Sequence, residues 1–170
     1  MADGTFGVEV VTPEQPLYEG GATSIVLATS DGALTVLDGH TPLVGDVVPC
    51  EVKIDRPDGT PLRLAVHGGF VQVDTSAGAA EGLAEGDGPL PGLSTRVTIL
   101  AGVAEIADEI DVSRAELAKE SASQRVSELA GGRGPTTEGE DGGEADFERV
   151  QADKALARAE LRLAVAAGSD

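Results

Sequence analysis

The stretch EVKIDRPDGTPLRLAVHGGFVQV, residues 51–73, decides the fold class. Apolar and polar residues alternate in it, so that Val52 and Ile54 share one face of the first run while Arg63 and Ala65 face away from the leucines of the second. Successive side chains of a strand point to opposite faces of a sheet, so this alternation predicts strands. Glycine-containing turns separate the three runs, and we therefore predict three successive strands, 51–54, 62–66 and 70–73.

The same pattern extends outward in both directions. Short apolar runs separated by further turn signals predict four more strands: 8–11, 24–28, 33–37 and 96–101. Many short strands at such spacing are typical of a β-sandwich or barrel. Residues 76–94 interrupt the pattern, since they are rich in Gly, Ala, Glu and Pro and have no steady period. We predict a flexible surface loop there, with a distinct small element as the less favoured interpretation.

A helical period replaces the strand period after Leu100. Small and apolar residues recur every three or four positions in two segments: Ala115, Ala118, Ala122, Val126 and Leu129, and then Ala152, Ala155, Ala159, Leu163 and Ala166. This spacing places them on one face of each of two helices. A Gly-rich acidic loop, 131–146, separates the helices, with Asp146 as the expected N-cap of the second. We predict two domains, a β-sandwich over 1–105 and an antiparallel helical hairpin over 106–170.

The composition excludes several classes of protein. The chain has 170 residues, of which 41% are hydrophobic and 2% aromatic, and its net charge is -18. Such an acidic chain repels phosphate backbones, and it has few aromatic side chains on which bases stack, so nucleic-acid binding is disfavoured. No apolar run is long enough to span a membrane, and the first seven residues lack the features of a signal peptide. We expect any membrane association to go through partner proteins.

No residue pattern indicates catalysis or metal binding. Cys50, the single cysteine, has no identifiable base partner and is interpreted as a small buried apolar residue. His40 and His67 lack neighbouring ligand spacing, so we expect no metal site; we expect His40 to hydrogen-bond a turn. The phosphate-binding pattern GxxxxGK[ST] is absent. A hydrolase is therefore disfavoured, because no nucleophile and base are paired.

Five stretches in order carry a resemblance to one family. They are VEVVTP at 8–13, GALTVLDGHTPL at 32–43, HGGFVQV at 67–73, VTILA at 97–101 followed by AE at 104–105, and IDVSRA at 110–115. Together they resemble the epsilon chains of bacterial F-type ATP synthases. The resemblance implies a flattened β-sandwich of about ten strands followed by a two-helix hairpin. It departs from the usual pattern at 76–94 and 131–146, where connections are enlarged.

The resemblance also implies a function. It implies a non-catalytic subunit of the central stalk, which helps couple proton flow to ATP synthesis and inhibits ATP hydrolysis through its hairpin. The implied partners are the gamma subunit, the c-ring and the catalytic β and α subunits, and the implied location is the cytoplasmic face of the plasma membrane. No cofactor is required, although regulatory ATP is a candidate ligand. The alternative is a stand-alone β-sandwich binding module with a helical tail.

Two sets of site residues follow from the resemblance. The candidate ATP site consists of Glu105, Ile110, Asp111, Arg114, Ala115, Arg158 and Arg162. The segment 110–115 also has a structural interpretation that does not exclude the first, since Asp111 is a good helix cap and Ser113 with Glu116 would form a capping box. Against ATP binding, Ser121 stands where good ATP binders of the family have arginine.

The second set is a basic stripe on the last helix. Lys154, Arg158 and Arg162 recur every four residues in the least acidic part of the chain. One interpretation is an exposed face with local ion pairs, each worth about 0.3–0.5 kcal/mol. The resemblance implies another, an inhibitory face that the extended hairpin presents to acidic segments of the β subunits.

Overall fold

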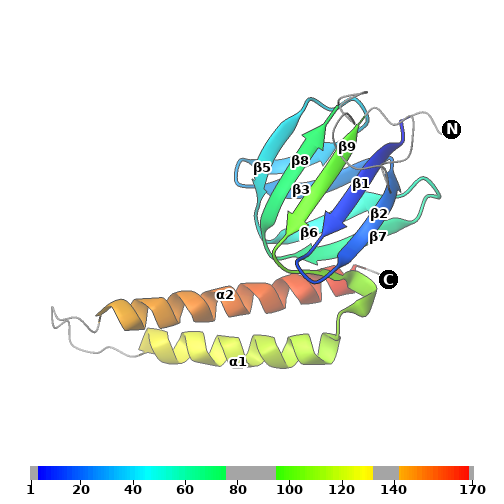
Figure 1. Ribbon diagram of the computed structural model, residues 1–170. Coiled ribbons are helices and arrows are strands. Elements are labelled where there is room, and N and C mark those ends of the chain that lie inside the picture. Colours follow the sequence, from blue (N-terminus) through cyan, green and yellow to red (C-terminus); the bar gives the residue numbers. More distant parts are fainter. Residues whose placement is uncertain (1–3, 76–94, 132–141, 169–170) are drawn as a thin grey trace. The chain divides into compact units, whose positions relative to one another are not determined.

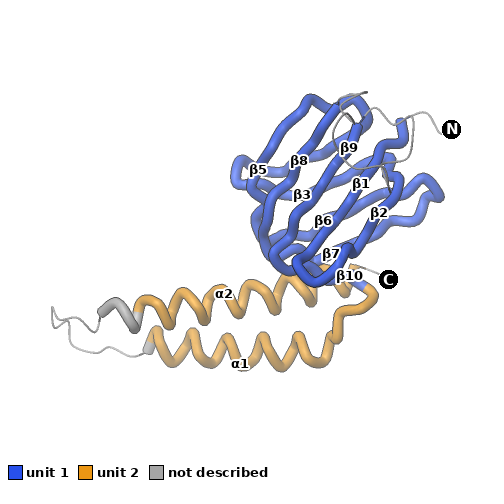
Figure 2. Tube along the Cα trace, in the orientation of Figure 1, with its two compact units in different colours: residues 1–107 blue, residues 108–170 orange. Residues whose placement is uncertain are grey.

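The computed structural model describes residues 4–75, 95–131 and 142–168. The chain divides into two compact units, Met1–Ala107 and Asp108–Asp170, which Figure 2 shows in different colours. The domain boundary predicted after residue 105 lies two residues before this division. The loop predicted at 76–94 lies outside the described residues.

Ten strands form the described part of the first unit. They are β1 (Phe6–Val11), β2 (Pro16–Ala22), β3 (Ser24–Thr29), β4 (Gly32–Val36), β5 (Leu43–Val47), β6 (Cys50–Asp55), β7 (Pro61–Val66), β8 (Gly69–Asp74), β9 (Arg96–Ala101) and β10 (Ala104–Ile106). Their order in the sheet is β10-β7-β6-β3-β5-β8-β9-β1-β2, with β4 paired to β3. The fold implied by the resemblance, about ten strands followed by two helices, is confirmed.

The sheet folds over between β3 and β5. Only one residue pair, Thr29 with Val47, joins these two strands. The strands before this point and those after it form two layers that face each other, as the first unit in Figure 1 shows. Neighbouring strands are antiparallel except β1 and β9, which are parallel. The result is the predicted sandwich, with one inner face on each layer.

The apolar side chains that alternate along the strands fill the core between the layers. Val52 and Ile54 are fully buried, as predicted, and Val71 and Val73 come from the opposite layer. Ala65 is also fully buried, although its position in the alternation places it on the other face of β7. On that face its neighbours across the strands are Glu51 and Glu105, whose longer side chains flank the small alanine. The core is aliphatic apart from Phe6.

The sequence pattern identified seven of these strands and missed β2, β5 and β10. Two glycines in β2 and Gly45 in β5 interrupt the alternation of apolar side chains. The third missed strand, β10, has only three residues, all half-buried, and is too short for a period to be visible. Local propensity is weak in such segments, and pairing with neighbouring strands decides their conformation.

The described second unit consists of a short 3-10 turn, η1 (Ala107–Glu109, which begins in the first unit), and two helices, α1 (Val112–Gly131) and α2 (Gly142–Ala167), which lie side by side and antiparallel (Figure 1). Alanines fill the contact between the helices, as predicted. The buried ones are Ala115, Ala122, Ala152 and Ala159. In this unit, neither helix is long and apolar enough to cross a membrane.

The predicted helix faces and limits need three corrections. Ala118, predicted on the buried face of α1, is exposed, whereas Val165 of α2 is fully buried and was not predicted. The predicted loop 131–146 is too long, because α1 includes Gly131 and α2 begins at Gly142. Asp146 is therefore inside α2 and is not its N-cap; glutamate and alanine at 144–145 favour helix and extend it past the glycines. The rest of that loop, 132–141, lies outside the described residues.

Candidate functional site

The start of α1 carries four of the predicted site residues. Asp111 precedes the helix, and its Oδ1 accepts a hydrogen bond of 3.0 Å from the backbone N–H of Arg114. Its carbonyl oxygen accepts the first helical bond, 2.9 Å from the N–H of Ala115. Asp111 is thus the N-cap, as predicted. The capping box predicted for Ser113 and Glu116 is wrong, because Ser113 lies inside the helix at its second position.

The four residues differ in what they offer to a ligand. Ile110 and Ala115 are buried, so their side chains offer a ligand little surface. The side chain of Arg114 is exposed and carries a positive charge at the helix N-terminus, where backbone N–H groups also favour anions. The carboxylate of Asp111 opposes this preference and occupies one of those N–H groups. The cap and an anion therefore compete for the same end of the helix.

The hairpin brings the predicted arginines of α2 into the same half of the unit. Lys119 Nζ of α1 lies 3.3 Å from Glu160 Oε1 of α2. This contact shows which turns of the two antiparallel helices lie beside each other. Arg158 and Arg162 flank Glu160 in sequence, so they lie on the half of α2 that pairs with the first half of α1. Arg158 is exposed and Arg162 is half-buried.

Glu105 belongs to the first unit, whereas the other six candidate residues belong to the second. It lies on β10, and its Oε1 is 3.5 Å from Nε2 of His67, whose side chain is buried. His67 precedes the predicted turn at Gly68 and Gly69, which the structure contains. Six of the seven candidate ATP contacts therefore share the helical unit, and the seventh is engaged by a histidine of the sandwich.

The three cations of the predicted basic stripe all lie on α2 and differ in exposure. Lys154 and Arg158 are exposed, and within the described ranges neither forms an ion pair. At 100° per residue, exposed Phe147 and Val150 fall on the same side of the helix as these two cations. Arg162 follows Arg158 by four residues and is half-buried. The spacing of Phe147, Val150 and Lys154 carried this signal in the sequence, but the predicted face of the last helix began only at Ala152.

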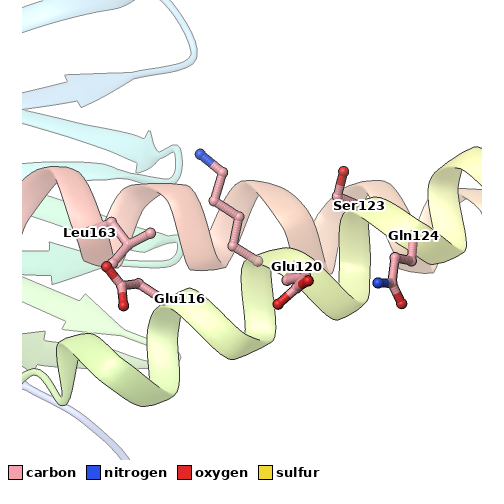
Figure 3. Close-up of a pocket in the computed structure, with 6 residues that line it drawn as sticks. Glu116, Glu120, Ser123, Gln124 and Leu163 are labelled. Atoms are coloured by element: carbon pink, nitrogen blue, oxygen red, sulfur yellow. The ribbon is translucent and has the colours of Figure 1, made fainter.

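An open depression on the helical unit does not coincide with either predicted site. Figure 3 shows Glu116, Glu120, Ser123 and Gln124 of α1 and Leu163 of α2, which line it together with Lys119. Two carboxylates face it, and the only cation in this lining is paired with Glu160. Such a lining disfavours phosphate, so the charges of the depression do not indicate a nucleotide site.

The histidines and the cysteine have structural contacts. His40 Nδ1 lies 2.8 Å from the carbonyl oxygen of Thr41, which confirms the turn contact predicted for it. Cys50 is half-buried rather than fully buried, and its Sγ donates to the carbonyl oxygen of Ala28 at 3.7 Å. In the part of the chain that the structure describes, no three His, Cys, Asp or Glu side chains form a group that could hold a metal ion.

Comparison with protein families matches both units in chain order. Residues 5–77 match the model described as "ATP synthase, Delta/Epsilon chain, beta-sandwich domain". Residues 108–167 match the model described as "ATP synthase, Delta/Epsilon chain, long alpha-helix domain". The second match begins within one residue of the division between the compact units and contains all the predicted site residues except Glu105.

Curated relatives cover most of the chain. An ATP synthase epsilon chain of Desulforudis audaxviator is 36% identical over 74% of this chain and 77% of its own length. One from Anoxybacillus flavithermus is 37% identical over 72% and 76%. One from Caldanaerobacter subterraneus is 30% identical over 96% and 95%, so its similarity extends through both units.

A solved structure shares the fold. A chain in the cryo-EM structure of the Euglena gracilis mitochondrial ATP synthase (OSCP/F1/c-ring) aligns with a TM-score of 0.64 at 18% identity. The alignment covers 95% of this chain and 81% of that one. At this identity the likeness supports the architecture of strands followed by helices.

Proposed function

This chain belongs to the ATP synthase delta/epsilon family, and from that premise we propose how its two units divide the work of an epsilon subunit. It is the epsilon chain of an F-type ATP synthase, a non-catalytic subunit of the enzyme complex. The observation that carries this conclusion is the match of both family models in order, with relatives aligned over both units. It replaces the alternative of a stand-alone binding module.

The sandwich is the stalk-binding unit in this proposal. It binds the gamma subunit and the c-ring and rotates with them, and the chain reaches the cytoplasmic face of the membrane only through the complex. Support comes from the continuous core between the two strand layers, which gives a rigid body able to transmit torque. A pull-down with the gamma subunit tests this assignment: the full chain retains gamma, and a chain that does not retain it contradicts the stalk role.

The helical unit is the regulatory one. Its helices meet through alanines, which bury little apolar area, so separating the two helices from each other costs less than separating leucine-lined helices. In an extended position the hairpin presents Lys154 and Arg158 to acidic segments of the catalytic subunits and blocks hydrolysis. These two cations support the proposal because they are exposed and form no ion pair with another described residue.

Charge reversal tests the inhibitory role. The double change Lys154→Glu with Arg158→Glu is expected to relieve inhibition of ATP hydrolysis in the assembled complex. Arg149→Glu is the matched control, because Arg149 is an exposed arginine of the same helix on a different side. Relief by the control to the same extent would show that net charge, and not this face, carries the inhibition.

Regulatory ATP is a second proposal for the same unit. Arg114, Arg158 and Arg162 supply guanidinium groups for phosphate, and ATP bound only to the compact state stabilises that state by about 2.7 kcal/mol at a hundredfold excess over its Kd. Calorimetry with ATP, comparing the wild type with Arg158→Ala and the control Arg149→Ala, tests it. Equal heats for the wild type and Arg158→Ala would remove Arg158 from the site.

A further inference from the structure

The strand through which the chain leaves the sandwich is held on one side only. β10 is the last strand in the sheet order, and β7 is its one neighbour among the described strands (Figure 2). Three residue pairs join the two strands, from Ala104 with Val66 to Ile106 with Leu64. The residues of β10 are all half-buried, and η1 follows directly in the chain. Because so few contacts hold β10, a single side-chain interaction has a large effect on how firmly the strand is attached.

A buried histidine and a glutamate meet beside this strand. Nε2 of His67 lies 3.5 Å from Oε1 of Glu105, the middle residue of β10. The side chain of His67 is 3% exposed and that of Glu105 is 30% exposed. The backbone N–H of His67 also donates to the carbonyl oxygen of Val103 at 2.9 Å. His67 therefore contacts the exit segment 103–105 through both its backbone and its ring.

The contact made by the ring depends on charge. A distance of 3.5 Å exceeds the roughly 2.7–3.2 Å of ordinary N–H···O bonds, so the attraction is mainly between opposite charges and requires a protonated ring. Burial opposes charging the ring, whereas a carboxylate at this distance, in a site with little water, favours it. An ordinary histidine titrates near pH ~6.5, so the charge of such a pair changes within the physiological range.

Few other charges of the sandwich surround this pair. On β6, the carboxylate of Glu51 is paired with Arg63. Burial raises the pKa of the Cys50 thiol on the same strand, so the thiol stays protonated at neutral pH. The neighbouring segments 68–69 and 101–103 contain only Gly, Ala and Val. Of the described sandwich residues around the pair, the histidine is thus the one that changes charge between about pH 5 and 8.

We propose that His67 and Glu105 form a pH-sensitive latch on β10: in mildly acidic conditions the protonated ring pairs with the carboxylate and holds β10 against β7, and at alkaline pH the neutral ring gives up this hold. The bound proton stabilises the attached strand, so this stabilisation is lost as the pH rises through the titration of the pair. Because β10 leads into η1 and then α1, the latch acts on the strand from which the helical unit begins. It is a property of the single chain and goes beyond the proposed function.

Titration of the two histidines tests the pairing. NMR follows the ring protons of His67 and of His40, whose ring lies against the carbonyl oxygen of Thr41 and serves as the internal control. Glu105→Gln is expected to lower the titration midpoint of His67 by about one pH unit and to leave that of His40 unchanged. The variant His40→Gln assigns the two signals. An equal midpoint for His67 with and without the Glu105 carboxylate would overturn the pairing.

Hydrogen exchange of the β10 amides tests the latch in the full chain. After correction for the intrinsic effect of pH on exchange, protection at Ala104–Ile106 is expected to be roughly three- to tenfold higher at about pH 5.5 than at about pH 8, since one unit of midpoint corresponds to tenfold. His67→Gln and Glu105→Gln are each expected to remove this difference, and His40→Gln is expected to keep it. Wild-type protection that is independent of pH, or that rises with pH, would show that protonation does not hold the strand.

Discussion

Gly69 begins β8 at a point where the backbone of β9 passes close by. A Cβ added there would overlap the carbonyl oxygen of Leu100, and the φ of +155° is one that side chains rarely adopt. We therefore expect Gly69→Ala to lower the free energy of unfolding by about 3 kcal/mol. Gly59→Ala is the control: its φ is +82° but nothing lies within 4 Å, so the cost is about 1 kcal/mol. Urea denaturation measures both, and equal losses would contradict the overlap.

The ionisation of the Cys50 thiol can be followed through its reactivity. Burial raises the pKa of its thiol; Glu51 adds to the rise and the hydrogen bond with the backbone of Ala28 reduces it. Alkylation by iodoacetamide at pH 8 is therefore expected to be slow in the folded chain and fast in denaturant, since the thiolate is the reactive form. Equal rates would show that the thiol is not protected.

The same group makes stability depend on pH. The unfolded thiol ionises first as pH rises, so the free energy of unfolding falls above the ordinary thiol pKa. Cys50→Ala removes this part of the alkaline loss and leaves the rest. An unchanged pH profile in the variant would assign the loss to other groups.

At the residue scale, the sequence predicted the helix cap at Asp111 and the buried face of Val52 and Ile54, because both follow from local spacing. It did not predict that Phe70 and Leu100 would be exposed together. In both strands the alternating apolar residues form the buried face, and Phe70 and Leu100 lie on the opposite face. Only the register between β8 and β9 places these two side chains opposite each other.

Among the elements, α1 depends on its cap. Asp111→Ala is expected to lower the stability of the helical unit by about 1 kcal/mol, because the N–H of Arg114 loses its acceptor. Asp111→Asn preserves the cap and is expected to be nearly neutral. Hydrogen exchange in the first turn of α1 distinguishes the two, and equal protection in both variants would mean that the cap does not hold the helix start.

The elements also show where sequence reasoning stops. Strands with clear alternation were predicted within one or two residues of their bounds, whereas glycine-rich β2 and β5 were missed. The residues of the candidate ATP site were implied by the family resemblance, and six of the seven lie in one unit. The contact between Glu105 and His67 could not be predicted, because the pairing of β10 with β7 brings together residues far apart in sequence.

For the molecule as a whole, the division into two units predicts independent folding of the first. A chain ending at Ala107 retains every strand and the whole core of the sandwich. It is expected to unfold in urea in one cooperative transition. A gradual transition would show that the sandwich needs the helical unit for its stability.

The most direct test of the division of work is ATP hydrolysis by a complex assembled without this subunit, measured after adding either the full chain or residues 1–107. We predict that both forms bind the complex and that only the full chain lowers the hydrolysis rate. Equal rates with the two forms bound would contradict a regulatory role for the hairpin.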